Sequence, residues 1–561
     1  MNFSSNKNKY NSIRNVVYGK NGAVATSTPI AAQAGLEILK KGGNAVDAAI
    51  ATAACLTVVE PTGCGIGGDA YALVWIQKEK KLYGLNSSGF APEKMKLEEY
   101  EGMDSMPKYG FGAVTVPGIP AAWGELSKKY GKLSLLECLE SAINYARNGY
   151  AVGQTVSNLW QKVYDEYEEN LKGEEYKYWF ETFGKIGRAP KAGEIFKCEE
   201  MALTLEEIGK TNSESFYRGS LADKIDEFSR QYNGFIRKSD LEKFYPQWVE
   251  PISTEYKGYK VFEIPPNGHG ITVLMALNIL KGFELDKNKE HVENYHKIIE
   301  SLKLAFADSK TYVTDIKDME VKVEELLNEE YAKERRKLIG KKAVEPICGD
   351  PYSPGTVYLC SGDKDGNMVS YIQSNYTEFG SGLVVPHTGI ALHNRGNNFS
   401  LNKNHINVIK PFKKPYHTII PGFLCKNNEA VGAFGVMGAF MQPQGQLQVL
   451  TNLIDFNMNP QEALDAPRWQ WIKNKEIEVE SDMNKEIVQG LIEKGHHIKV
   501  MEDFTNMGKG QIILKESNTK TVQFDHLQSS SSNKQNESNK SGHMVYVCGT
   551  EKRCDGHVAV W

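Results

Sequence analysis

A short stretch in the second half of the chain carries the side chain that is best placed to act as a nucleophile. Ser353-Pro354-Gly355 forms a tight corner, and the β-branched and aromatic residues that follow from Thr356 predict a strand. An Asp-Gly turn at residues 363–367 then predicts a second strand over residues 368–374. A hydroxyl residue at the start of a strand is usually only a strand residue. The stretch therefore indicates catalysis only together with other segments.

Composition sets bounds on the partners. The 561 residues are 41% hydrophobic and 24% charged, as in an ordinary globular protein. The 66 basic residues are outnumbered by 70 acidic ones, and no dense basic run occurs, which argues against binding to nucleic acid or to a membrane surface. No run reaches the roughly 18 apolar residues of a transmembrane helix.

The N-terminus and the cysteines indicate the compartment. Residues 1–18 are polar and lack the apolar core of a secretory signal, so a disordered leader is expected there. The nine cysteines are scattered and form no CxxC pair, which favours free thiols in the cytoplasm over disulfides or a zinc site. His291 and His296 are five positions apart, whereas metal ligands on one helix face are commonly four apart. We expect no metal and no cofactor.

The first half of the chain predicts two consecutive helices followed by a glycine-rich loop. One helix begins at Pro29 and ends before Gly42, and Asn44 caps a second helix that runs to about Val58. The small residues of the second helix predict burial. The loop at residues 63–68 matches GxGxxG, but a helix precedes it and a strand follows it, the reverse of a dinucleotide fingerprint. We expect instead a loop whose backbone passes close to a neighbour, at positions that tolerate positive φ.

Two later segments complete the layout. Residues 158–210 are charged, aromatic and helix-permissive, and they predict a solvated helical layer. Residues 524–543 contain a serine and asparagine run and predict a low-complexity loop between two late strands.

Several segments together resemble the gamma-glutamyltranspeptidase family of N-terminal nucleophile hydrolases, particularly its cephalosporin-acylase-like branch. The matching stretches keep one order along the chain, and the similarity spans about residues 19–561. They are GNAVDAAIATAACLTVVEPTGCGIGGDAYALVW, VTVPGIPAAWGEL, NGFIRKSDLEKFYPQWVEPISTEYKGYKVFEIPPNGHG, AFADSKTYVTD, PGTVYLCSGDKDGNMVSYIQSNYTEFGSG, GIALHNRGNNFSL, KPYHTIIPG, GVMGAFMQPQGQLQVL and LDAPRW.

The resemblance implies an α+β, four-layered αββα sandwich whose precursor cuts itself between Gly355 and Thr356. The threonine hydroxyl would attack the Gly355 carbonyl, and hydrolysis of the ester would leave Thr356 with a free α-amine. Such an amine has a pKa of about 7.7 to 8, so it can act as the base for its own hydroxyl. The expected subunits are residues 19–355 and 356–561, a heterodimer of the chain's own fragments that can itself dimerise.

The family's other site residues map onto later positions. Gly438 and Ala439 correspond to a paired-glycine oxyanion hole, and an alanine methyl costs about 1 kcal/mol or more if position 439 needs positive φ. The substrate shell maps onto Asn375, Arg395, Asn398, His417 and Thr418.

Departures from the family pattern concern specificity. An arginine expected before Ala91 is absent, and Arg395 is the candidate replacement for binding a carboxylate. Asn398 stands where an aspartate is usual, and Gln373 where a supporting threonine is usual. His417 is equally well explained as a core histidine.

The resemblance therefore implies a self-processing hydrolase or transferase. It would pass a gamma-glutamyl group from a glutathione-type amide to water or an amine through a threonyl ester. An acylase for other acyl amides, glutaryl or cephalosporin-like, is the first alternative. An uncleaved, non-catalytic binding homologue is the second.

Overall fold

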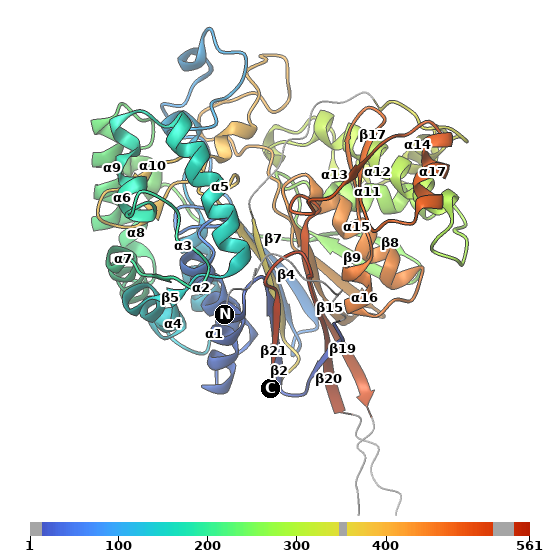
Figure 1. Ribbon diagram of the computed structural model, residues 1–561, viewed down its shortest axis with the longest axis horizontal. Helices are drawn as coiled ribbons and strands as arrows, with labels where there is room; N and C mark the ends of the chain where they lie inside the picture. Colours follow the sequence, from blue (N-terminus) through green and yellow to red (C-terminus); the bar gives the residue numbers. More distant parts are fainter. Residues whose placement is uncertain (1–13, 347–355, 520–542) are drawn as a thin grey trace, which may run out of the picture.

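The computed structural model describes residues 14–346, 356–519 and 543–561. Two antiparallel sheets lie face to face between two layers of helices (Figure 1). This arrangement confirms the predicted α+β, four-layered αββα sandwich.

The first sheet contains the strand that begins at the candidate nucleophile. Its seven strands have the order β21-β2-β10-β11-β3-β4-β7. In that order they are β21 (His557–Val560), β2 (Gly22–Thr26), β10 (Val357–Asp363), β11 (Met368–Ser374), β3 (Asp69–Ile76), β4 (Lys81–Ser87) and β7 (Gln247–Val249). The expected turn at residues 363–367 joins β10 to β11, its antiparallel neighbour.

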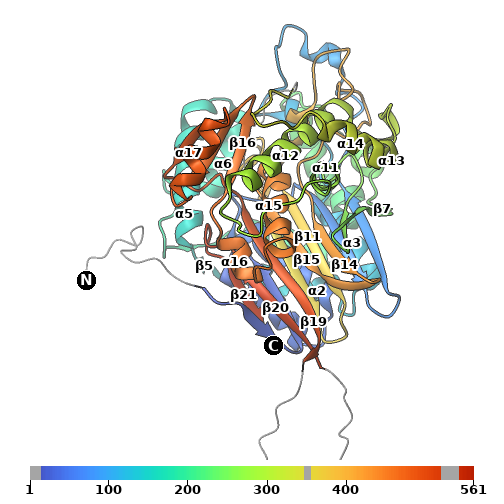
Figure 2. The same cartoon turned by 90° about the vertical axis from the view of Figure 1, so that its right-hand side faces the viewer.

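The second sheet also has seven strands, in the order β1-β20-β19-β15-β14-β9-β8. They are β1 (Val17–Gly19), β20 (His543–Thr550), β19 (Lys509–Thr519), β15 (Glu429–Met437), β14 (Gly422–Lys426), β9 (Tyr259–Glu263) and β8 (Ile252–Tyr256). Figure 2 looks toward these strands from the side of α15 and α16.

The two sheets contact each other where an aromatic ring of one sheet packs against a glycine of the other. A Cβ built on Gly435 in β15 would lie 2.4 Å from the Tyr358 ring of β10. One built on Gly362 in β10 would lie 2.6 Å from the Tyr546 ring of β20. The absent side chains make room for the rings, so the sheets can approach closely at these two positions.

One helical layer covers the first sheet. It consists of α1 (Pro29–Lys40), α2 (Ala45–Val59), α3 (Ile119–Tyr130), α4 (Leu135–Asn148), α5 (Gln154–Asn170), α6 (Lys177–Phe183), α7 (Glu199–Lys210), α8 (Glu214–Arg218), α9 (Ser220–Gln231) and α10 (Lys238–Glu242). The two predicted N-terminal helices are confirmed. Thr28 caps α1, and Asn44 forms a capping box with Asp47 at the start of α2. Every residue of α2 is buried, as its small side chains predicted.

The other layer covers the second sheet. It consists of α11 (Ile271–Leu280), α12 (Val292–Tyr312), α13 (Val323–Leu326), α14 (Glu329–Arg336), α15 (Met441–Ile454), α16 (Pro460–Asp465) and α17 (Lys485–Glu493). A small sheet of β16 (Trp469–Lys473), β17 (Glu476–Glu480) and β18 (His497–Met501) adjoins it, and two short hairpins, β5 (Tyr150–Ala151) with β6 (Ile195–Phe196) and β12 (Val384–Val385) with β13 (Ile390–Ala391), complete the strands. None of the helices in the described residues is long and apolar enough to cross a membrane.

Two sequence expectations need correction. The segment 158–210 is not a solvated layer, because Trp160, Trp179 and Phe183 are buried and surround Phe379 at ring distances of 5.4, 5.2 and 4.9 Å. The predicted leader is too long at its C-terminal end, since Val17 and Tyr18 already pair with β20. Residues 1–13 and 524–542 lie outside the described residues.

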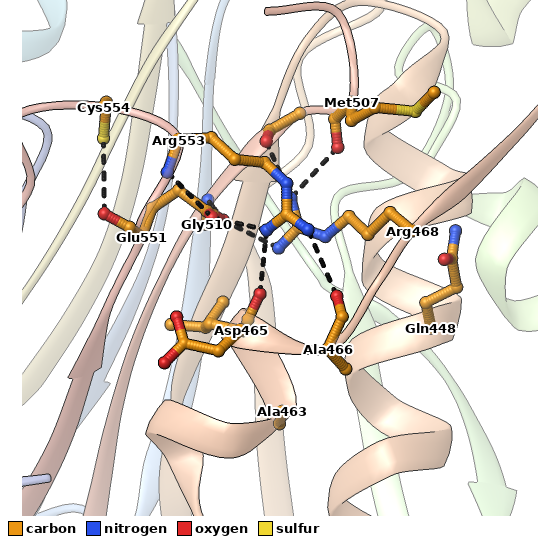
Figure 3. A network of polar contacts seen from close by, with 12 residues as sticks. Gln448, Ala463, Asp465, Ala466, Arg468, Met507, Gly510, Glu551, Arg553 and Cys554 are labelled. Carbon is orange, nitrogen blue, oxygen red and sulfur yellow. Dashed lines mark hydrogen bonds and ion pairs between the residues drawn. The ribbon is translucent and has the colours of Figure 1, made fainter. Parts of the chain in front are cut away.

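A buried network of charges holds the loop that follows β18. Arg468 donates from Nη1 to the carbonyls of Met507 and Gly508 (3.0 and 2.7 Å) and from Nη2 to Glu551 (2.7 Å) (Figure 3). The second oxygen of Glu551 accepts from Arg553 at 2.6 Å. The network fixes Gly508, which forms part of the wall of the cavity described below.

Candidate active site

The Thr356 side chain lies at the head of β10, in the middle of the first sheet. It is 5% exposed. Its hydroxyl donates to Ser374 Oγ at 3.2 Å, and Gln442 Nε2 donates to it from 3.4 Å. Ser374 ends the neighbouring strand and Gln442 lies in the first turn of α15. Two neighbouring strands of the first sheet and a helix of the layer over the second sheet therefore meet at this one oxygen.

A cavity of about 270 Å³ opens beside Thr356. Gly63 and Gly438 line it close to the threonine, and the ionisable residues on its wall are Glu60, Lys162, Glu166, Glu378, Asp503 and Lys509. The site thus combines a hydroxyl with enough space for a small acyl group and with charges that can select one.

Gly438 and Ala439, the predicted oxyanion-hole pair, both adopt a left-handed backbone conformation. Their φ angles are +131° and +46°, so the position predicted to strain an alanine does so. Their carbonyls accept from the N–H groups of Met441 and Gln442 at 2.8 and 3.1 Å. Within the described chain, no hydrogen bond uses the N–H groups of Gly438 or Ala439. These donors stand just before the N-terminus of α15, where the helix dipole favours negative charge.

Three of the predicted substrate residues meet in a second group, around Asp69. Arg395 donates to the Thr418 hydroxyl at 2.7 Å, and His417 Nε2 donates to Asp69 at 3.0 Å. Burial, together with the charge of Arg395, lowers the pKa of His417 to about 3, so its imidazole is neutral. Burial raises the pKa of Asp69, but His393, His417 and Arg395 outweigh it and hold the pKa below its ordinary value. Asp69 is therefore the anion of this group.

Arg395 keeps donors available. It is fully buried, and its Nε and Nη2 atoms have no hydrogen-bond partner within the described residues. Its guanidinium lies 4.5 Å from the centre of the Tyr376 ring. Burial lowers its pKa to about 10, which leaves it charged at neutral pH. A buried guanidinium with unused donors can bind a carboxylate.

Asn375 and Asn398 also carry unused polar atoms. Both side-chain atoms of Asn375 and the Nδ2 atom of Asn398 are buried without a partner in the described chain. Neither asparagine lines the cavity at Thr356, and neither do Arg395, His417 and Thr418. Thr356 and Gly438 thus share the cavity, while the predicted substrate residues lie behind it. Gly355 falls outside the described residues.

The glycine-rich loop explains how these groups approach one another. A Cβ on Gly68 would lie 2.5 Å from the Ser374 carbonyl, and one on Gly63 would lie 2.7 Å from Val357. The predicted close approach is confirmed. The expected positive φ is not, because Gly63, Gly65, Gly67 and Gly68 all keep ordinary φ angles.

Sequence reasoning missed two contacts of the nucleophile. Ser374, not Gln373, supports the Thr356 hydroxyl, because Gln373 points away and donates to the Ala53 carbonyl at 2.8 Å. Successive residues of a strand face opposite sides, so Gln373, at the position where the family usually has a supporting threonine, faces away from this hydroxyl. Gln442 lay within a recognised motif, but only the fold brings it to Thr356.

One histidine cluster has metal-ligand geometry but a different explanation. His296, Glu300 and His496 offer ligand atoms within 4.8 Å of one another. The Lys303 ammonium, however, lies 2.7 Å from Glu300 and donates to the Val344 carbonyl at 2.5 Å. Because this ammonium already takes the place of a cation, we assign the cluster a structural role. His291 instead caps α12.

Two stacked antiparallel sheets between helical layers, with a threonine at the head of a central strand beside a cavity, define an N-terminal nucleophile hydrolase, a class of amidohydrolase enzymes. The chain belongs to the gamma-glutamyltranspeptidase family, whose model, described as "Gamma-glutamyltranspeptidase", matches residues 31–537. The resemblance inferred from the motifs is confirmed.

Individual relatives carry different substrate names. The chain is 36% identical over 496 residues to the glutathione hydrolase-like YwrD proenzyme of Bacillus subtilis (strain 168), covering 87% of this chain and 93% of that protein. It is 30% identical over 501 residues to the oxamate amidohydrolase proenzyme of Klebsiella pneumoniae, covering 87% and 93%. The crystal structure of a cephalosporin acylase from Bacillus halodurans is 52% identical, with a TM-score of 0.93 over 100% of this chain and 99% of that one.

Proposed function

We propose that this enzyme cuts itself before Thr356 and then transfers gamma-glutamyl groups from glutathione-type amides to water or to an amine. One observation carries the proposal: the buried Thr356 hydroxyl is oriented by Ser374 and Gln442 and faces a cavity that also contains Gly438. The names of the relatives, two of them proenzymes, support it.

Self-cleavage uses the threonine hydroxyl. Its Oγ attacks the Gly355 carbonyl, the C–N bond to Thr356 breaks, and the acyl group moves to oxygen. Water then hydrolyses the ester and leaves a carboxylate on Gly355 and an amine on Thr356. That amine, with an ordinary pKa of about 7.7 to 8, is the base for later cycles.

Turnover repeats the same chemistry on a substrate. Thr356 Oγ attacks the amide carbonyl while the α-amine takes its proton, and the N–H groups of Gly438 and Ala439 stabilise the resulting oxyanion. The amine leaves, and water or an acceptor amine releases the acyl group from the threonyl ester.

Strand order supports a stable pair of fragments after cleavage. In the first sheet, β10 lies between β2 and β11, and β11 in turn pairs with β3. In the second sheet, β14 pairs with β9. Each sheet therefore contains strands from both sides of residue 356, so residues 19–355 and 356–561 remain one folded unit. A dimer of such units is compatible with this arrangement.

Arg395 is the proposed carboxylate ligand. Its two unused donors, Nε and Nη2, form the fork that binds a carboxylate through two parallel hydrogen bonds. Asn375, Asn398, His417 and Thr418 do not line the cavity, so their proposed role is to support Arg395 from outside it, with His417 neutral and donating to Asp69.

A mass measurement of the acyl-enzyme tests the proposal. Rapid quenching with a gamma-glutamyl anilide should add one glutamyl group to the fragment that begins at Thr356. Arg395→Lys should lower kcat/KM for this donor by about tenfold or more, because lysine cannot reproduce the fork. Addition of the acyl group to another residue would contradict the assignment.

An acylase for other dicarboxylic amides is the second candidate. The similarity to the Bacillus halodurans cephalosporin acylase favours it. Turnover of a glutaryl anilide with no turnover of the gamma-glutamyl anilide would decide for this function.

A further inference from the structure

Glu378 is the carboxylate in the cavity that the proposed function does not yet use. It follows β11 by four positions and lines the same cavity as Thr356 and Gly438. Its side chain is only 7% exposed. Within the described residues, its carboxylate has no hydrogen-bond or ion-pair partner, and only burial and the charges of Lys108 and Glu166 act on it. A buried carboxylate without a partner is costly unless a ligand satisfies it.

Among the other charges of the cavity, only Lys509, whose charge acts on Glu60, lacks a hydrogen-bond or ion-pair partner within the described residues. Glu166 binds Lys108 at 2.5 Å, and Asp503 binds Lys162 at 3.4 Å. Glu60 accepts a hydrogen bond from Ser27. The charged groups that act on Glu378 are Lys108, which is engaged by Glu166, and Glu166 itself. Tyr167 and Tyr376 are the remaining titratable groups close to it.

The loop holds Glu378 in a strained position. The φ angle of Glu378 is +30° and that of Tyr376 is +78°. Residues other than glycine rarely adopt positive φ angles. On one side Thr377 is fixed by Asn394, which donates to its hydroxyl at 2.6 Å. On the other side Phe379 is packed among Trp160, Trp179 and Phe183. The contacts of Thr377 and Phe379 thus keep the backbone of Glu378 in its strained conformation. Backbone strain that the surrounding structure maintains is typical of functional sites.

We propose that Glu378 is a specificity residue that binds a protonated amino group on the acyl part of the substrate while Thr356 attacks the amide. This inference rests on the proposed function and extends it. Asn398, at the position where a carboxylate was expected for this task, brings no charge. Glu378 supplies that charge from a different place, within the cavity of the nucleophile. Arg395, stacked on Tyr376 of the same loop, would hold the carboxylate of the same amino-acid head group.

The pKa of Glu378 predicts how substrate binding should depend on pH. Burial raises its pKa to about 7, partly offset by Lys108. An ammonium ligand favours the charged carboxylate, so binding improves as the pH rises through 7. The preference for an amino-bearing acyl group should grow between about pH 6 and pH 8.

Two anilide donors that differ only in this amino group provide the test. They are gamma-glutamyl-p-nitroanilide and glutaryl-p-nitroanilide, and the quantity measured is the ratio of their kcat/KM values with the processed full-length enzyme. We expect a wild-type ratio above one. Glu378→Gln should lower it about tenfold or more and remove its increase with pH.

A second variant and a control separate charge from folding. Glu378→Gly removes the carboxylate but suits the positive φ, so it should fold and lower the ratio as far as Glu378→Gln. Glu169→Gln, on the exposed face of α5, should leave the ratio unchanged.

The outcomes differ for the two proposals. A ratio that stays the same in both Glu378 variants, or a wild-type ratio at or below one with measurable gamma-glutamyl turnover, overturns the role of Glu378 and leaves the proposed function intact. If the processed wild type turns over neither donor, the proposed function itself fails, and the role of Glu378 fails with it.

Discussion

The Thr356 hydroxyl donates to Ser374 Oγ across 3.2 Å, and Ser374 itself pairs in register with Asp69 of β3. One residue of β11 thus lies between the nucleophile and the carboxylate that holds His417. The position of the reactive oxygen is therefore set by the first sheet, and not by a flexible loop. This connection makes the site sensitive to changes that do not touch a substrate.

Ser374→Ala should impair the chemical step. Loss of the Ser374 hydroxyl removes one of the hydrogen bonds that orient the Thr356 side chain. We therefore expect kcat to fall about tenfold or more with little change in KM. Steady-state kinetics on a gamma-glutamyl anilide measures this. The matched control is Ser370→Ala on the same strand, which removes a hydrogen bond with Tyr358 (2.8 Å) and should reduce stability more than kcat. Equal kcat values for wild type and Ser374→Ala would contradict the role of Ser374.

Gly68→Ala should disturb the same contact from the other side. The added Cβ would lie 2.5 Å from the Ser374 carbonyl and 2.9 Å from the Ile119 side chain. We expect a loss of about 1 to 3 kcal/mol in the free energy of unfolding, with slower self-cleavage. Denaturant unfolding and electrophoresis provide the two readouts. Gly340→Ala, where a Cβ would meet nothing within 4 Å, is the neutral control. Two variants of equal stability would show that the loop does not need its glycine.

Glu551→Gln should make stability depend less on pH. Burial raises the pKa of Glu551, but Arg468 and Arg553 overcome this and lower it to about 2. Because the folded-state pKa lies below that of the unfolded chain, the stabilisation is complete above about pH 5 and disappears as the pH falls toward 2.

At pH 7 the Glu551→Gln variant should therefore be about 3 kcal/mol or more less stable, since Arg468 loses its buried carboxylate partner while Arg553 keeps only Glu480. Thermal unfolding at pH 7 and at pH 4 measures the difference between variant and wild type, which should shrink at the lower pH. A difference that is the same at both values would rule out this linkage.

Local sequence signals predicted the elements that carry the site. The helix start at Pro29, the cap at Asn44 and the Asp-Gly turn before β11 lie where expected, because each is decided by neighbours in sequence. The threonine at the head of β10 was recognised from collinear motifs and not from its own residues.

The contacts of the nucleophile were less predictable, because they join distant segments. Gln442 is 86 residues from Thr356, and its role depends on how α15 meets the first sheet. Ser374 was not singled out from the sequence, because its contact with Thr356 depends on how β11 lies beside β10. Glu378 gave no signal at all, since its importance comes from burial, backbone strain and the lack of a partner.

The N-terminal sequence of freshly purified protein tests the central claim most directly. By proportion of the 62.7 kDa chain, self-cleavage should give fragments of roughly 40 and 23 kDa, the smaller one beginning Thr-Val-Tyr-Leu. Thr356→Ala should remain a single chain under the same conditions. An intact wild-type chain that persists for days, or a new N-terminus at any residue other than Thr356, would contradict the account.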